Sequence, residues 1–196
     1  MKRLLLFLSF LLIGSALCGQ TAHNSKYSVK KGRIVFDTPK RAQGQQSMLG
    51  FAAEPIPVVR VGIIGLGMRG PGAVTRLGFI DNVEIRALCD LYPERIEENQ
   101  RILEKAGMPR ADAYSGEEGW KQLCERDDID LVYIVTPWQK HVPMAVYAME
   151  HGKHVALEVP AAQSIAECWQ LVDTSERTRR HCMMLENCVY DFFELT

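Results

Sequence analysis

The sequence lacks several patterns that would point to particular chemistries. None of its six cysteines forms a C-x-x-C pair, and no histidine lies at metal-ligand spacing from them. We therefore expect free core thiols, not a zinc site or a disulfide framework. Net charge is only −1, and lysine and arginine are not clustered with aromatic residues, so a nucleic-acid partner is not expected. No Ser-His-Asp arrangement and no metal-ligand set is evident.

The sequence also lacks an apolar run as long as the ~20 residues that a membrane-spanning helix needs. Its longest apolar run, Leu4–Ile13, follows Lys2-Arg3 and precedes small residues, which is typical of a secretory signal peptide. We expect residues 1–18 to be such a peptide, with export to the periplasm or the cell surface and no transmembrane segment. Acylation at Cys18 in a lipoprotein is the alternative, although Leu17 fits such a site poorly.

The composition that remains is ordinary for a globular protein, with 47% hydrophobic and 24% charged residues. Residues 19–57 are polar and irregular, and we expect a linker or an N-terminal arm there. A short strand is predicted at Ile34–Phe36, and Pro55 and Pro57 close the segment.

A glycine motif dominates the rest of the chain. The apolar run Val58–Ile64 ends in Gly65-Leu-Gly67-Met-Arg-Gly70, which reads G-x-G-x-x-G and precedes a predicted helix. Strand, tight loop and helix in this order indicate a dinucleotide site. Gly65 allows the tight turn, Gly67 lets the backbone approach a pyrophosphate, and Gly70 lets helix and strand pack closely.

From residue 58 to 187, strand and helix patterns alternate with short connections. This alternation predicts an α/β domain with a Rossmann-type, doubly wound parallel sheet. Strands are expected at Val58–Gly65, Val83–Cys89, Leu131–Thr136, His154–Leu157 and His181–Glu186. Helices are expected after Gly70, at Pro93–Lys105, from a capping box at Ser115–Glu118 to about Glu125, at Val142–Gly152, and from a cap at Ser164 to about Thr178.

Ligands of such sheets bind beyond the carboxyl ends of the strands, so polar residues at these ends are candidates for the site. Asp90 ends the second expected strand, where a carboxylate accepts a hydrogen bond from a ribose hydroxyl and repels a 2′-phosphate. This position favours NAD over NADP, with a solvated turn aspartate as the alternative. Met68 and Arg69 lie in the glycine loop, where the backbone faces the cofactor and Arg69 is either an added positive charge or an exposed arginine.

Three later strand ends add candidates near the nicotinamide. Thr136–His141 follows the third expected strand, and its His141 is either a polar contact or a helix cap. Glu158 ends the next strand, where it either binds a hydroxyl or guides a proton, or is a plain loop acid. Asn187 follows the last strand and is placed to hydrogen-bond a ribose or a carboxamide.

Four motifs resemble the glucose–fructose oxidoreductase and inositol dehydrogenase (Gfo/Idh/MocA) superfamily: Thr136-Pro137, the loop ending in His141, Gly152–Val155 and Glu158–Pro160. That superfamily usually has Glu-Lys-Pro, with its lysine near the site of hydride transfer, where this chain has Glu158-Val159-Pro160. Val159 can neither titrate nor donate a hydrogen bond, which argues against simple dehydrogenase chemistry.

Over about residues 30–196, the sequence resembles one branch of that superfamily, glycoside hydrolase family 109, in Trp138–His141, Glu158–Ala162 and Met184–Phe193. The resemblance implies hydrolysis of α-N-acetylgalactosaminides with a retained NAD, and hence a glycan that contains N-acetylgalactosamine as substrate. In the implied scheme the sugar is oxidised at C3, the aglycone is eliminated, water adds, and C3 is reduced again, so there is no net redox change.

The resemblance also implies site residues. Its cofactor contacts correspond here to Met68, Arg69, Asp90, Trp138, Gln139, Lys140, His141, Glu158, Val159 and Asn187. It places Tyr190 at the edge of the sugar pocket. The family's acid–base residues lie mostly in a second α/β domain, so no catalytic residue is assigned.

We expect residues 188–196 to begin that second domain, the chain to be the N-terminal part of a family member, and any homo-oligomer to form through the missing domain. Two other functions remain open at this point. One is an exported NAD-linked sugar dehydrogenase without the usual lysine, and the other is a non-catalytic nucleotide-binding remnant.

Overall fold

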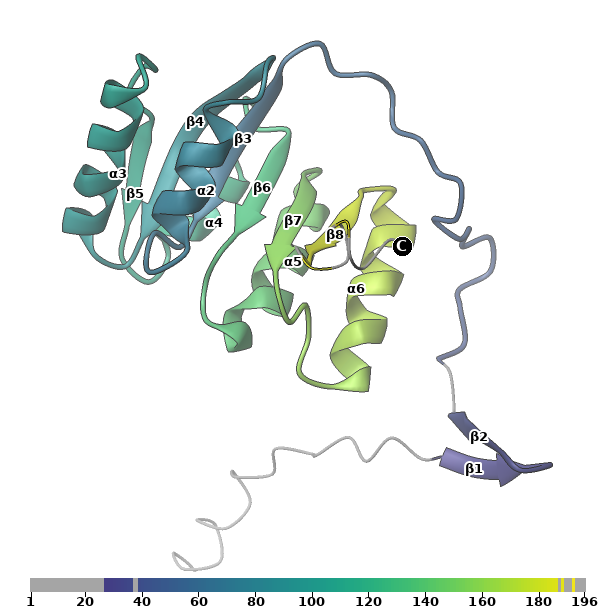
Figure 1. Ribbon diagram of the computed structural model, residues 1–196. Helices are drawn as coiled ribbons and strands as arrows, with labels where there is room; N and C mark the ends of the chain where they lie inside the picture. Colours follow the sequence, from purple (N-terminus) through teal and green to yellow (C-terminus); the bar gives the residue numbers. More distant parts are fainter. Residues whose placement is uncertain (1–26, 37–38, 187, 189–191, 193–196) are drawn as a thin grey trace, which may run out of the picture. The chain divides into compact units, whose positions relative to one another are not determined.

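The computed structural model describes residues 27–36, 39–186, 188 and 192 (Figure 1). The expected signal peptide and the candidates Asn187 and Tyr190 lie outside this part of the chain. The chain divides into two units, residues 1–38 and residues 39–196, which are described separately below.

The first unit contains a two-stranded hairpin. Strand β1 (Tyr27–Lys30) pairs antiparallel with β2 (Arg33–Phe36), so the strand expected at Ile34–Phe36 is present, with a partner that the sequence analysis did not predict. The turn uses Lys31 and Gly32, both with positive φ. This turn geometry matches the twist of the flanking strands.

The second unit is built on a six-stranded parallel sheet, in the order β5-β4-β3-β6-β7-β8 (Figure 1). The strands are β3 (Val59–Ile64), β4 (Val83–Asp90), β5 (Asp112–Ser115), β6 (Leu131–Ile134), β7 (His154–Glu158) and β8 (Cys182–Leu185). This is the strand order 3-2-1-4-5-6 of the Rossmann fold, and the order reverses between β3 and β6. The predicted doubly wound parallel sheet is confirmed.

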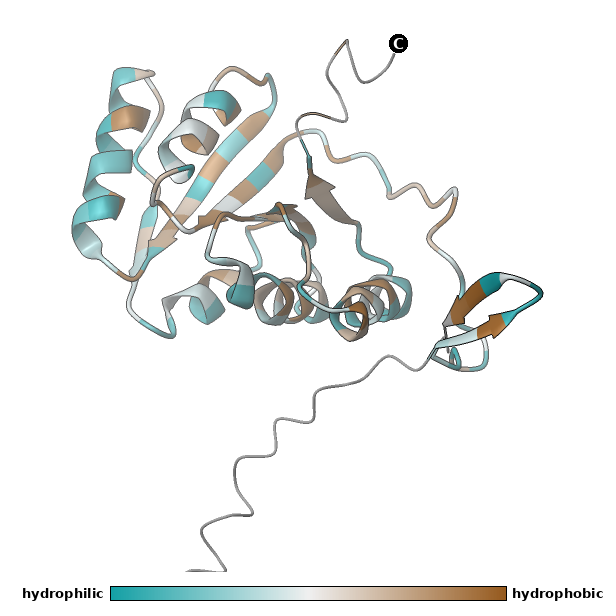
Figure 2. Cartoon of the chain, turned by 60° about the horizontal axis from the view of Figure 1, so that its bottom comes forward, coloured by the Kyte–Doolittle hydropathy of each residue, from teal (hydrophilic) through white to brown (hydrophobic). Residues whose placement is uncertain are grey.

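Helices cover both faces of this sheet (Figure 2). They are α2 (Gly70–Leu77), α3 (Pro93–Lys105), α4 (Gly119–Cys124), α5 (His141–Glu150) and α6 (Ile165–Thr178), with a short 3₁₀ helix η1 (Trp138–Lys140) before α5. One buried cluster joins the sheet to α2 and α3, and a second joins it to α4, α5 and α6. Because both faces are covered, Ile63 and Ile64 are each buried although they point to opposite faces.

The sequence predicted side-chain caps at the N-termini of two helices, and the structure shows one of them. The expected cap at Ser164 is confirmed, because its hydroxyl accepts a hydrogen bond from the Glu167 N–H at 3.2 Å. The expected capping box at Ser115–Glu118 is wrong. Ser115 ends strand β5, and α4 begins at Gly119 without a side-chain cap.

The segment between residues 39 and 57 has no regular secondary structure, but it is hydrogen-bonded to α6. Gln45 Nε2 donates to Glu176 Oε2 at 2.8 Å, and Arg41 pairs with Glu176 at 3.0 Å. The ring of Phe51 lies 5.0 Å from that of His181, just before β8. These contacts fix the segment against one end of the sheet and give the buried Glu176 carboxylate its partners.

The five cysteines from Cys89 onward are free thiols. Burial raises the pKa of Cys89, Cys124 and Cys182 to about 12, so these thiols keep their protons at neutral pH and are poor nucleophiles. Within the part of the chain that the structure describes, no helix is long and apolar enough to cross a membrane.

Candidate dinucleotide-binding site

A cavity of about 700 Å³ lies at the carboxyl ends of the parallel strands. Its walls come from the segments that follow β3, β4, β5, β6 and β7. The volume suits a small-molecule cofactor. The cavity also lies where the strand order reverses, which is where doubly wound sheets bind their ligands.

The glycine loop forms one wall of this cavity. Gly65 has φ +95°, and a Cβ there would lie 2.6 Å from the Val135 carbonyl oxygen. A Cβ on Gly70 would lie 2.7 Å from the Gly65 carbonyl oxygen, whereas one on Gly67 would meet only Arg95 Nη1 at 3.6 Å. The first and third glycines therefore allow the chain to fold here, and the second leaves open space for a ligand.

Helix α2 begins at Gly70, directly after this loop, and its first turn carries no acidic residue. Its free N–H groups and its dipole therefore favour an anion at this end of the cavity. Arg69 precedes the helix and lines the cavity, so a side-chain positive charge adds to that field. Met68 also lines the cavity and is almost fully exposed.

Asp90 ends β4 as predicted, and its carboxylate is held by the backbone. Oδ2 accepts a hydrogen bond from the Leu66 N–H at 2.7 Å, and Oδ1 accepts one from the Tyr92 N–H at 3.1 Å. The side chain is buried but lines the cavity. Each carboxylate oxygen can accept more than one hydrogen bond, so Asp90 is a fixed acceptor with capacity left for a donor in the cavity.

Glu158 ends β7 and is shared by two donors. Arg69 Nε donates to its Oε2 at 3.1 Å, and the Tyr133 hydroxyl donates to its Oε1 at 2.9 Å. Burial, and then the bond to Glu158, raise the pKa of Tyr133, so its hydroxyl keeps its proton. Glu158 is therefore a fixed acceptor that connects the glycine loop to the β6 and β7 strand ends. Val159 lines the cavity beside it.

The residues after β6 are placed in two different ways. Trp138, Gln139 and Lys140 form the exposed helix η1 and line the cavity. His141 is fully buried and does not line the cavity. Its Nδ1 lies 2.8 Å from the Pro160 carbonyl oxygen and its Nε2 lies 2.9 Å from the Thr136 carbonyl oxygen. The structure therefore places His141 as a bridge between two strand-end loops, not at the expected position of a cofactor contact.

Several lining residues escaped the sequence analysis. Arg95 reaches the cavity from the first turn of α3, while Glu117 and Trp120 reach it from the segment after β5. Thr136 Oγ1 is buried without a hydrogen-bond partner among the residues described, at the end of β6. A buried hydroxyl that lacks a partner at a cavity wall fits a polar ligand group. Among the described residues, no group of three His, Cys, Asp or Glu side chains is arranged to hold a metal ion.

The strand order, the glycine loop at the switch point and the carboxylate at the end of β4 define a dinucleotide-binding Rossmann domain. A family model described as "Oxidoreductase family, NAD-binding Rossmann fold" (Gfo/Idh/MocA) matches residues 59–186. The chain belongs to this family, and its cofactor is NAD.

A relative with a more specific family name narrows this assignment. The chain is 58% identical, over 198 residues, to "Glycosyl hydrolase family 109 protein 1" of Bacteroides thetaiotaomicron. The match takes in 100% of this chain and 42% of that protein, so the chain spans about two fifths of its length. The resemblance to glycoside hydrolase family 109 is confirmed.

Two solved structures share the fold. One is an NAD-binding protein from Listeria innocua, with a TM-score of 0.58, 27% identity, and coverage of 68% of this chain and 36% of that one. The other is a 3-ketoreductase from Actinomadura kijaniata in complex with NADP, with a TM-score of 0.56, 26% identity, and coverage of 65% and 37%.

Proposed function

We propose that the protein is an NAD-dependent glycosidase that acts on α-N-acetylgalactosaminides. The observation that carries this proposal is Val159. It lies on the cavity wall, next to Glu158, where dehydrogenases of the wider superfamily are expected to carry a lysine. The identity of 58% with a relative named for glycosyl hydrolase family 109 supports the same reading.

In the proposed reaction the sugar is oxidised at its C3 hydroxyl. The resulting ketone acidifies the C2 proton. When this proton is removed, its electron pair forms a C1=C2 double bond and the aglycone leaves C1 with the electron pair of the C1–O bond. Water then adds across the double bond, with its oxygen on C1 and a proton on C2, and C3 is reduced again. NAD supplies the hydride acceptor that this cycle needs and returns the hydride at its end. The sum of the steps is hydrolysis without net redox change.

Residues of this chain bind and orient the cofactor in this proposal. The N–H groups at the start of α2 hold the pyrophosphate, and Asp90 accepts a hydrogen bond from the adenosine ribose. Arg69, Glu158 and helix η1 (Trp138–Lys140) surround the nicotinamide half, with Val159 beside them. Asn187 is proposed as a further contact, and His141 holds the loops that carry the others.

The sugar and its acid–base groups are proposed to be bound largely by a second domain, with Tyr190 at the boundary. We also propose that residues 1–18 direct export, since Lys2-Arg3 and the apolar run after them fit a signal peptide. The glycan would then be met outside the cytoplasm, either by a released protein or by one anchored at Cys18.

Release of p-nitrophenol from its α-N-acetylgalactosaminide tests the proposal, in this chain and in a protein that continues past Thr196. We expect release only from the longer protein, because most of the sugar contacts are assigned to its second domain. If the longer protein, loaded with NAD, releases no sugar, the glycosidase proposal is wrong.

A sugar oxidoreductase is the second candidate, favoured by the fold shared with the 3-ketoreductase from Actinomadura kijaniata. It predicts net formation of NADH when the longer protein is incubated with free N-acetylgalactosamine and NAD. The glycosidase predicts no net NADH with the same sugar, so absorbance at 340 nm separates the two. If neither activity is found while NAD is still bound, the result favours the third hypothesis, a non-catalytic nucleotide-binding remnant.

A further inference from the structure

Tyr133 is a buried tyrosine in β6, between Ile63 of β3 and Ala156 of β7. It belongs to the apolar cluster that joins the sheet to α2 and α3. Its ring packs well in such surroundings, but its buried hydroxyl needs a polar partner, and that partner is Glu158 Oε1 at 2.9 Å. Among the described residues that line the cavity, Glu158 is present and Tyr133 is not, so Tyr133 acts on the cavity through Glu158.

The Glu158 carboxylate is held from two sides. Tyr133 donates to Oε1 from within the sheet, and Arg69 Nε donates to Oε2 at 3.1 Å from the glycine loop. The Glu158 side chain is only 7% exposed, and a carboxylate buried to this degree needs such donors. Each oxygen can accept a further hydrogen bond, so both keep capacity for a ligand in the cavity. The two donors therefore set the direction in which this acceptor faces.

The two donors differ in how firmly they are placed. The Arg69 side chain is 47% exposed and stands at the start of α2, where a pyrophosphate is expected to compete for its guanidinium. Tyr133 is enclosed by the sheet and α2. Burial, and then the bond to Glu158, raise the pKa of Tyr133, and the nearby Arg76 opposes this shift without reversing it. The hydroxyl is thus a permanent donor at neutral pH.

We propose that Tyr133 is a positioning residue of the cofactor site: its bond to Oε1 holds Glu158 in the orientation in which the carboxylate contacts the nicotinamide half of NAD. The inference rests on the proposed contact between Glu158 and the cofactor, and it does not depend on the glycosidase reaction. A contact of this kind requires its polar group to be held within about 0.5 Å of the productive position. The rigid donor in β6 provides that support for a side chain at the end of β7.

Calorimetric titration of the full 196-residue chain with NAD and with ADP tests the proposal. ADP has the adenosine and both phosphates but lacks the nicotinamide half, so its affinity reports whether the rest of the site is intact. The variants are Tyr133→Phe, Glu158→Ala and the double variant. Tyr147→Phe is the matched control, because its hydroxyl also donates to a glutamate, Glu125, and neither residue is among the described residues that line the cavity.

We expect Tyr133→Phe to weaken NAD binding by about fivefold or more and to change ADP binding by less than about twofold. In the Glu158→Ala background the same substitution should have no further effect on NAD, because Tyr133 acts through that carboxylate. Tyr147→Phe should leave both affinities unchanged. If Tyr133→Phe weakens NAD and ADP equally, or weakens NAD as much without Glu158 as with it, the role of Tyr133 is merely structural and the proposal is wrong.

Glu158→Ala separates the two possible failures. If it leaves the ratio of NAD to ADP affinity unchanged, the proposed contact of Glu158 with the cofactor is wrong, and the inference fails with it. If it lowers the ratio and Tyr133→Phe does not, the contact stands and the inference alone is wrong. Failure of the glycosidase assay in the longer protein would leave all these binding constants unaffected.

Thermal unfolding of each variant shows whether it folds. If Tyr133→Phe does not, Glu158→Asp is the second test, because it keeps the charge but withdraws the carboxylate from the Tyr133 hydroxyl by one methylene group. We expect Glu158→Asp to lower the ratio of NAD to ADP affinity by about fivefold or more. A ratio equal to that of the wild-type chain would overturn the proposal.

Discussion

The glycines after β3 have separable roles at the residue scale. We predict that Gly67→Ala leaves the free energy of unfolding nearly unchanged, because the nearest atom to the new Cβ is Arg95 Nη1 at 3.6 Å. It should still weaken NAD binding by about tenfold or more, since the methyl group occupies the space that the pyrophosphate needs. Thermal unfolding and NAD titration of the same sample measure the two effects.

Gly65→Ala is the contrasting variant. Its φ of +95° and the Val135 carbonyl at 2.6 Å make a side chain unfavourable, so we expect a loss of stability of about 1–3 kcal/mol. If Gly67→Ala were the more destabilising of the two, this assignment of roles would be wrong.

His141 is the second residue whose role the structure defines. Replacing it with leucine removes the two ring nitrogens near the carbonyl oxygens of Thr136 and Pro160, at least one of which donates a hydrogen bond. We predict a loss of about 1–3 kcal/mol in urea unfolding, which is the cost of leaving a buried carbonyl unsatisfied. NAD binding should weaken as well, because both loops border the cavity. The control is His151→Gln, at an exposed position at the end of α5, which should change little.

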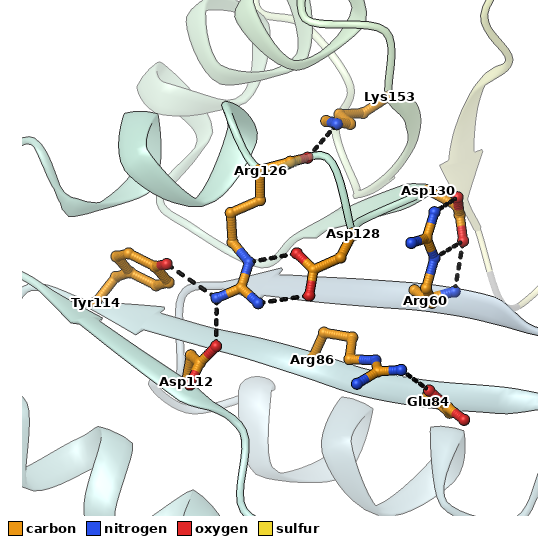
Figure 3. Close-up of polar contacts among 9 residues, drawn as sticks. All are labelled: Arg60, Glu84, Arg86, Asp112, Tyr114, Arg126, Asp128, Asp130 and Lys153. Atoms are coloured by element: carbon orange, nitrogen blue, oxygen red, sulfur yellow. Dashed lines mark hydrogen bonds and ion pairs between the residues drawn. The ribbon is translucent and has the colours of Figure 1, made fainter.

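At the scale of elements, the amino ends of the strands are joined by ion pairs, on the side of the sheet opposite the cavity (Figure 3). Arg60 of β3 donates from Nε and Nη2 to both oxygens of Asp130, just before β6, at 2.8 and 2.6 Å. The Asp130 carboxylate also accepts the Arg60 N–H at 2.9 Å. Arg126 binds Asp128 in the same two-pronged way. The Arg60–Asp130 pair links β3 to the residue before β6, at the point where the strand order reverses, whereas Arg126 and Asp128 lie in the same loop before β6.

The Arg60 guanidinium lowers the pKa of Asp130. The stability from this pair is therefore present above the ordinary aspartate pKa and lost as pH falls through the lowered folded-state value. We predict that Asp130→Asn costs about 1–2 kcal/mol at pH 7, and that the difference from wild type shrinks below about pH 4. Urea unfolding across this pH range measures it. Glu84→Gln, which removes a more exposed pair with Arg86, should have little effect, and an equal loss would contradict the prediction.

A second titrating group lies between β7 and β8. The Nδ1 atom of His154 accepts the His181 N–H at 3.0 Å, so this nitrogen carries no proton in the folded state. Burial, and then the positive charges of Arg180 and His181, lower the pKa of His154. Stability is therefore expected to fall as pH drops below the ordinary histidine value of about 6.5, because the unfolded chain takes up the proton first.

His154→Asn keeps a hydrogen-bond acceptor but cannot titrate. We predict that this variant loses less stability than wild type between about pH 7 and pH 5, by up to ~1 kcal/mol. Chemical unfolding at several pH values measures the difference. Parallel curves for the two proteins would show that His154 does not titrate in this range.

At the scale of the whole molecule, everything that builds the cavity lies in the second unit. The residues of both buried clusters and all cavity-lining residues lie between residues 59 and 185. We predict that a chain starting at Pro39 keeps the melting temperature and the NAD affinity of the longer chain. A saturating ligand should raise the stability of both equally, by ~2.7 kcal/mol at 100 times the dissociation constant. A tenfold weaker affinity of the shorter chain would contradict this division.

The sequence alone determined the class of the protein, because the signals involved are local. An apolar strand, a glycine loop and a helix are adjacent in the chain, and helix α3 has the bounds Pro93–Lys105 that its pattern predicts. Strand β5 was missed, because its residues Asp112–Ser115 are exposed apart from the partly buried Tyr114. It is an edge strand whose existence depends on pairing with β4, which no local pattern records.

Only the tertiary structure decided what several of the candidate residues do. His141 bonds to Pro160, nineteen residues away, and Glu158 is joined to Arg69 across eighty-nine residues. Arg95 enters the site because α3 begins beside Asp90 and points its first turn at the cavity. Such contacts exist only once the parallel sheet has brought the strand ends to one edge, because connections of a dozen or more residues separate neighbouring strands.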